Sequence, residues 1–147
     1  PGSADPGTPD NETGLVLAVE AAGRRLLLTG DLEGRALERF VEGGPGTCDV
    51  LVAPHHGSRT SLPADLAVAT RPAFVVASGA GGPSWPEVRG AYATASGGAE
   101  VLLTGGRGAL AIDFTAGDVV VGRFAAGVWR PAALEPPPAG ETSDATP

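Results

Sequence analysis

The chain has 147 residues and a formal net charge of −7. Its length fits one domain with a single core, and none of its apolar runs approaches the ~20 residues that a membrane helix needs. All ten basic residues are arginine, which excludes lysine chemistry such as Schiff bases and the phosphate-binding GxxxxGK loop. The negative charge argues against general electrostatic attraction to nucleic acid, but not against an enzyme that meets phosphates through metal ions.

Both ends of the sequence are rich in proline, glycine and acidic residues. Residues 1–10 and 131–147 hold too few apolar groups to offset the entropy of ordering, so we expect a disordered linker and a disordered Pro-rich tail. The folded unit should span residues 11–130. The sequence contains no methionine, even at position 1, and we therefore expect it to be a piece of a longer protein.

Strand-like and helix-like patterns alternate between these ends. We expect a hairpin turn at Ala22-Gly23, another around Ala116-Gly117, and Ser61 as the N-cap of the second helix. In chain order, the expected elements are strands at 15–19 and 25–29, a helix at about 32–42, a strand at 49–53, a helix at 62–70, a strand at 73–77, a helix at 86–96, a strand at 100–103, and strands at 109–114 and 119–124. This order predicts an α/β fold with antiparallel hairpins at the edges of its sheet.

Two predicted strands end in residues that can hold a metal ion. Asp31 follows LLLTG (26–30), and His55 and His56 follow LVAP (51–54). In open α/β folds, functional groups gather beyond the carboxyl ends of the strands. Carboxylate and imidazole together suit Zn²⁺ or Mn²⁺, and a carboxylate can bridge two such ions.

Each of these residues also has an ordinary structural interpretation. An aspartate between a strand and a helix is most often a helix N-cap, and a histidine pair in a loop is more often solvated than bound to metal. The metal hypothesis gains from the fact that the only two histidines of the chain are adjacent. Because neighbouring side chains in an extended segment point apart, we expect at most one of them to be a ligand.

Other polar residues receive smaller roles. Ser58 lacks the GxSxG elbow of a nucleophile, so we expect its hydroxyl to stabilise a turn. Arg59 is a candidate phosphate contact, with an exposed arginine as an equal alternative. We expect Cys48 to be a small buried hydrophobe, Trp85 to pack in the core, and Glu87 to be a first-turn helix charge.

Three segments together resemble a known family: residues 10–40 with TGD, residues 48–61 with HHGS, and residues 71–88. They are similar to the C-terminal part of the metallo-β-lactamase domain of ComEC-type competence proteins, and the resemblance runs from about Asn11 to Phe114. It implies the C-terminal half of an αββα sandwich with a mixed sheet, in a hydrolase that holds two metal ions, zinc or manganese. It also implies a soluble domain attached to a bacterial membrane channel that imports single-stranded DNA.

The resemblance also implies roles for single residues. Asp31 matches the carboxylate that bridges the two metals, and His55-His56 matches the last histidine motif. Asn11 matches an asparagine before the first strand and is, with Ser58 and Arg59, a candidate for substrate binding.

The chain departs from the family pattern in two places. It has no HxHxDH segment, which carries the principal metal site in the upstream half of the fold, and residues 79–86 read GAGGPSWP where relatives have Gly-His-Pro. The leading hypothesis is therefore that the chain is part of a metal-dependent phosphodiesterase and is inactive without an upstream half-domain. Two alternatives are a non-catalytic interaction module of the same fold and a metallo-hydrolase for small esters.

Overall fold

The computed structural model describes residues 13–105 and 108–131 of the chain. Five strands form one sheet in the order β1-β2-β3-β4-β5, in which β1 is antiparallel to β2 and the other neighbours are parallel. These strands are β1 (Leu17–Ala21), β2 (Arg24–Leu28), β3 (Val50–Val52), β4 (Phe74–Ala77) and β5 (Glu100–Leu103). The α/β prediction with a mixed sheet is confirmed.

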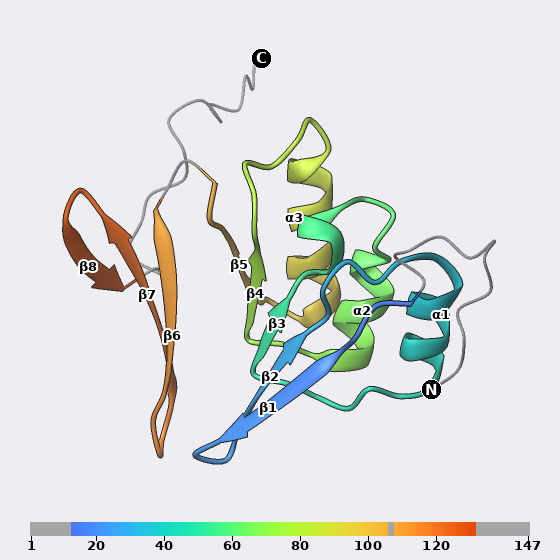
Figure 1. Cartoon of the computed structure of the whole chain (residues 1–147), viewed down its shortest axis with the longest axis horizontal. Helices are drawn as coiled ribbons and strands as arrows, with labels where there is room; N and C mark the ends of the chain where they lie inside the picture. Colours follow the sequence, from blue (N-terminus) through green and yellow to red (C-terminus); the bar gives the residue numbers. More distant parts are fainter. Residues whose placement is uncertain (1–12, 106–107, 132–147) are drawn as a thin grey trace, which may run out of the picture.

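Helices cover one face of this sheet, and a second sheet covers the other (Figure 1). The helices are α1 (Gly34–Glu42), α2 (Pro63–Thr70) and α3 (Trp85–Ser96), with a short 3₁₀ turn, η2 (Pro54–Gly57), before α2. The second sheet consists of β6 (Ala109–Phe114), β7 (Val119–Ala125) and β8 (Val128–Pro131), in that order and all antiparallel. None of the helices in the described part of the chain has the length and apolar character needed to cross a bilayer.

The core has two compartments, one on each face of the five-stranded sheet. Leu51 belongs to the compartment under the helices, while its neighbour Val50 belongs to the compartment between the two sheets. Because β3 is buried on both faces, it reads as a continuous apolar run rather than an alternating one. Between the sheets, the buried Arg123 of β7 donates a hydrogen bond of 3.1 Å to the carbonyl oxygen of Leu103 in β5.

Most predicted boundaries agree with the structure to within two residues, and three differences have clear causes. The first strand lies at Leu17–Ala21 instead of 15–19, because the tight turn at Ala22-Gly23 fixes its register opposite β2. Ser61 does not cap α2: its hydroxyl donates to the Ser58 carbonyl, and Leu62 occupies the N-cap position. Strand β8 was not predicted, and Pro131, expected in the tail, is its last residue.

The rest of the predicted linker and tail, residues 1–10 and 132–147, lies outside the described residues, so these two predictions stay open.

Candidate functional site

The loop that carries Asp31 and the loop that carries the histidines are joined at their bases. The buried Thr29 hydroxyl donates to the Val52 carbonyl at 2.6 Å, which ties the ends of β2 and β3 together. One step further, the backbone N–H of His55 donates to the Gly30 carbonyl at 2.9 Å. As a result, Asp31 and the two histidines emerge side by side at the carboxyl end of the parallel strands, as the sequence predicts.

The histidine pair has an unusual backbone conformation. His55 and His56 lie in the left-handed region, with φ of 47° and 58°. This corrects the expectation of an extended segment whose side chains point apart, because the two ring centroids lie 6.2 Å from each other. Left-handed backbone at residues other than glycine costs of order 1–3 kcal/mol each and clusters at functional sites.

Each imidazole is held by a neighbour through its Nδ1 atom. His55 Nδ1 lies 2.7 Å from Oε2 of Glu33, and His56 Nδ1 lies 2.7 Å from Oγ of Ser78. The Nε2 atom of His56 faces Oδ1 of Asp31 at 3.6 Å. The structure therefore joins the three predicted residues to two that sequence reasoning missed.

Asp31 does not play the ordinary structural role that its position suggested. Helix α1 begins at Gly34, and its N-cap residue is Glu33, which makes no side-chain capping bond. The Asp31 side chain is about half exposed and faces His56. Its carboxylate is thus free of helix capping and open to the solvent side of the site.

A shallow pocket of about 620 Å³ adjoins the histidines. It is lined by His55 and His56, by the loop 57–60 and by the glycine-rich loop 79–84. Ser58 accepts the backbone N–H of Thr60 and shares a hydrogen bond with its hydroxyl, so the prediction of a turn-stabilising hydroxyl is confirmed. The exposed Arg59 stands at this pocket, whereas Asn11 lies outside the described residues.

Glycine at position 57 is required by the pocket's geometry. Its φ is +80°, and a Cβ atom there would lie 2.9 Å from Cζ3 of Trp85 and 3.1 Å from Cβ of Ala77. We therefore expect Gly57→Ala to lower the free energy of unfolding by ~1–3 kcal/mol, measured by urea denaturation. Gly82→Ala in the same pocket, where a Cβ would meet nothing within 4 Å, is the matched control, and equal losses in both variants would contradict the steric explanation.

The metal hypothesis can be compared with the donor atoms that the structure brings together. Two ligands of one tetrahedral zinc ion, each at ~2.1 Å, lie ~3.4 Å apart. The 3.6 Å between His56 Nε2 and Asp31 Oδ1 fits such a pair. Among residues 13–105 and 108–131, however, no group of three or more His, Cys, Asp or Glu side chains is arranged to hold a metal ion. The described residues fit a metal as two ligands of an incomplete site.

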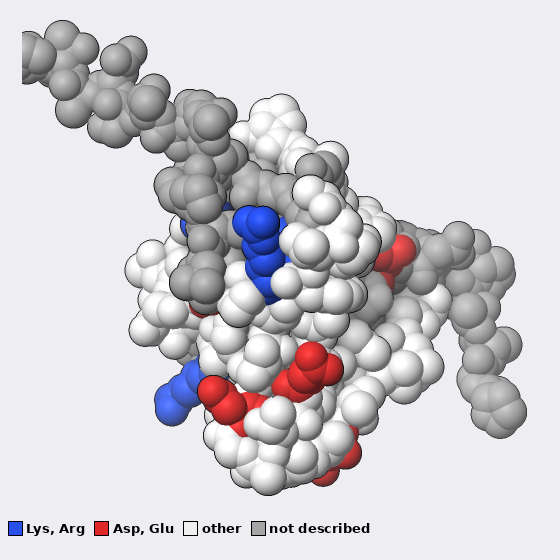
Figure 2. Space-filling model, turned by 90° about the vertical axis from the view of Figure 1, so that its left-hand side faces the viewer, with Lys and Arg blue, Asp and Glu red and all other residues white. Residues whose placement is uncertain are grey.

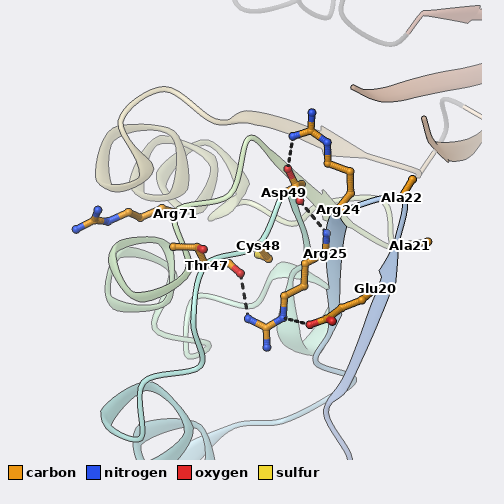
Figure 3. A pocket seen from close by; sticks show the side chains of 10 residues that line it. Glu20, Ala21, Ala22, Arg24, Arg25, Thr47, Cys48, Asp49 and Arg71 are labelled. Atoms are coloured by element: carbon orange, nitrogen blue, oxygen red, sulfur yellow. Dashed lines mark hydrogen bonds and ion pairs between the residues drawn. The ribbon is translucent and has the colours of Figure 1, made fainter. Parts of the chain in front are cut away.

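A second pocket, of about 680 Å³, lies at the opposite end of the strands (Figure 3). Two of its three arginines are already engaged: Arg24 bonds the carboxylate of Asp49 at 3.0 Å and the Gly117 carbonyl at 2.6 Å, and Arg25 bonds the carbonyls of Pro45 and Thr47 at 2.8 and 3.0 Å. These bonds join the starts of β2 and β3 to adjacent loops. The contacts of Arg24 and Arg25 therefore support the fold.

Cys48, beside this pocket, is buried as predicted, and burial raises the pKa of its thiol from 9.0 to about 11. The unfolded chain therefore releases this proton at lower pH than the folded one, and stability falls as pH rises through the window from 9.0 to about 11. Cys48→Ala lacks the thiol and so lacks this pH dependence. We therefore expect the difference in unfolding free energy between the wild type and Cys48→Ala to become smaller as the pH rises through that window. Urea denaturation at a series of pH values measures this, and an advantage independent of pH would contradict it.

Comparison with known proteins gives one informative relative. No family model matches the chain. The chain is 44% identical over 71 residues, or 47% of its length, to the protein called Competence protein ComA of Neisseria gonorrhoeae. The match covers 10% of that relative. The chain is thus related to a competence protein and corresponds to a small part of it.

Proposed function

We propose that Asp31, His55 and His56 belong to the active centre of a metal-dependent hydrolase that cleaves phosphodiester bonds. The observation that carries this proposal is the meeting of the Asp31 carboxylate and His56 Nε2, 3.6 Å apart, at the carboxyl end of β2 and β3. A carboxylate and an imidazole at zinc-ligand spacing, beside a second imidazole, are part of the donor set that a hydrolytic metal site uses. The motifs TGD and HHGS, in strand contexts that resemble the metallo-β-lactamase domain, support the same assignment.

In this proposal each residue has a defined task. Asp31 and one histidine would hold a divalent cation, and the Asp31 carboxylate would also serve a second one. Arg59, exposed at the pocket's rim, holds a phosphate oxygen through its guanidinium, while Ser58 keeps the loop that carries it in shape. A divalent cation held there, zinc or manganese, would supply Lewis-acid chemistry that activates water and offsets negative charge on the phosphate.

The substrate we propose is single-stranded DNA, in a pathway of DNA uptake. Support comes from the relationship to a competence protein and from the shape of the pocket, since a shallow surface lets a polymer strand pass where a closed cavity would not. The remaining metal ligands would come from an upstream half-domain with HxHxDH, in a soluble domain attached to a membrane channel.

The test is cleavage of single-stranded DNA by the full natural polypeptide that carries this sequence, in zinc or manganese. We expect cleavage that ceases on removal of the metal with a chelator, and little or none from residues 1–147 alone. Small carboxylic esters in the same assay distinguish a phosphodiesterase from an esterase. Metal-free cleavage, or robust turnover by the 147-residue chain, would contradict the proposal.

A second candidate is a non-catalytic interaction module. Strands β7 and β8 expose four large apolar side chains, Val120, Phe124, Val128 and Trp129, between 39% and 56%. In the view from the side of β6 to β8, uncharged side chains make up most of the described surface (Figure 2), and exposed apolar side chains in such surroundings often mark protein contacts. Zinc stoichiometry separates the two candidates, because a pure interaction module leaves the full polypeptide without bound metal.

A further inference from the structure

Both histidines of the site are bound at the same ring position. A carboxylate only accepts hydrogen bonds, so the 2.7 Å contact between His55 Nδ1 and Glu33 requires the proton to be on Nδ1. A neutral His55 then carries its lone pair on Nε2. Since no described residue makes a hydrogen bond to that atom, His55 presents a free ligand or acceptor atom beside the pocket.

His56 is a less direct case, because the Ser78 hydroxyl can either donate or accept. The contact on the other side of the ring decides between the two arrangements. If Nε2 carried the proton, a charge-assisted hydrogen bond to Asp31 would close to ~2.7–2.9 Å. The observed separation is 3.6 Å, which is the spacing of two electron-pair donors around a cation and too long for that bond.

We propose that Glu33 and Ser78 are positioning residues that hold the proton of each histidine on Nδ1, and that His56 is the histidine that shares a divalent cation with Asp31. His56 Nδ1 thus donates to Ser78 Oγ, and its Nε2 lone pair lies next to the Asp31 carboxylate. Partners of this kind fix ring orientation and the nitrogen that binds the metal. The catalytic use of this pair rests on the proposed function, whereas the proton positions do not.

The surroundings explain why such partners are needed. The His56 side chain is 62% exposed, so packing alone does not fix its ring. Ser78 directly follows β4, the strand next to β3, and its hydroxyl therefore links the histidine loop to a buried strand of the sheet. Glu33 does the same for His55 from the start of α1.

The experiment is long-range ¹H–¹⁵N NMR of the imidazoles in the metal-free 147-residue chain. In each neutral ring the spectrum identifies which of the two nitrogens carries the proton. We expect a proton on Nδ1 in both histidines. In Ser78→Ala the His56 signals should move to an average of the two tautomers while those of His55 stay, and Glu33→Ala should do the reverse.

Matched variants separate positioning from general damage. Ser78→Thr keeps the hydroxyl and should restore the wild-type His56 pattern, whereas Ser84→Ala, which changes another serine of the same pocket, should leave both histidines unaffected. A proton on His56 Nε2 in the wild-type chain would overturn the proposal. So would a Ser78→Ala spectrum identical to the wild type's.

Zinc provides a second readout on the same samples. We expect added zinc to shift the His56 Nε2 signal. Ser78→Ala should need a zinc concentration ~10–100-fold higher than the wild type for the same shift, because losing the hydrogen-bond partner of a metal ligand usually lowers metal affinity by that factor. No zinc-dependent change at His56 would overturn the shared cation site. A proton on Nε2 of His56 would refute this inference, and the hydrolase proposal would then be decided by the nuclease assay alone. Protons on Nδ1 of both histidines, without DNA cleavage by the full polypeptide, would refute the hydrolase proposal and leave the proton positions intact.

Discussion

Asp31→Asn is expected to lower metal-dependent cleavage of single-stranded DNA by more than about 100-fold in the full natural polypeptide. Outer partners of metal ligands already cost ~10–100-fold when removed, and Asp31 is proposed to touch the ions themselves. The amide keeps the size of the side chain but loses the negative charge and one of the two oxygens that a bridging ligand uses. Initial cleavage rates at saturating zinc or manganese measure the effect.

The Asp31→Asn result needs a control for charge and for folding. Asp65→Asn is the matched variant, because Asp65 is exposed in the first turn of α2 and neutralising it removes the same charge away from the site. We expect it to cleave DNA at the wild-type rate. Because the Asp31 side chain is about half exposed and caps no helix, Asp31→Asn should unfold at the wild-type urea concentration. Full activity in Asp31→Asn would refute the assignment of Asp31 as a metal ligand.

The order and type of the main elements could be predicted because their signals are local. Apolar runs such as Leu26–Leu28 and Val50–Val52 end at glycine or proline, and the helices show apolar residues at helical spacing. The first strand was misplaced because hydrophobicity favours Leu15, whereas the register is set by pairing of Leu17 with Leu28 across the Ala22-Gly23 turn. All five residues of β1 are exposed, so its sequence has no pattern of buried apolar residues from which its bounds could be predicted.

Strand β8 was missed for a similar reason. It pairs only with β7, through a two-residue turn at Ala126-Gly127 in which both residues have positive φ. Its four residues are exposed, and they adjoin a proline-rich segment whose composition favours disorder. The proline-rich composition therefore favoured a prediction of disorder, although Ala126-Gly127 is also compatible with a hairpin turn.

The candidate site shows where sequence reasoning ends. Asp31, His55 and His56 could be predicted because each follows a buried strand, and Ser78, which follows β4, could have been found by the same rule. Glu33 could not, because its contact with His55 spans 22 positions and depends on where α1 begins. The left-handed backbone of both histidines was equally out of reach, since only tertiary contacts stabilise it.

Leu51→Ala is expected to lower the free energy of unfolding by ~2–5 kcal/mol, a large part of the stability of a domain this size. Leu51 is fully buried in β3, and this strand leads directly into the histidine loop. Leu17→Ala, the same change at a side chain that is 49% exposed, should cost under ~1 kcal/mol. Urea denaturation followed by tryptophan fluorescence measures both variants. Equal losses would mean that β3 is not the centre of the core that holds the site in place.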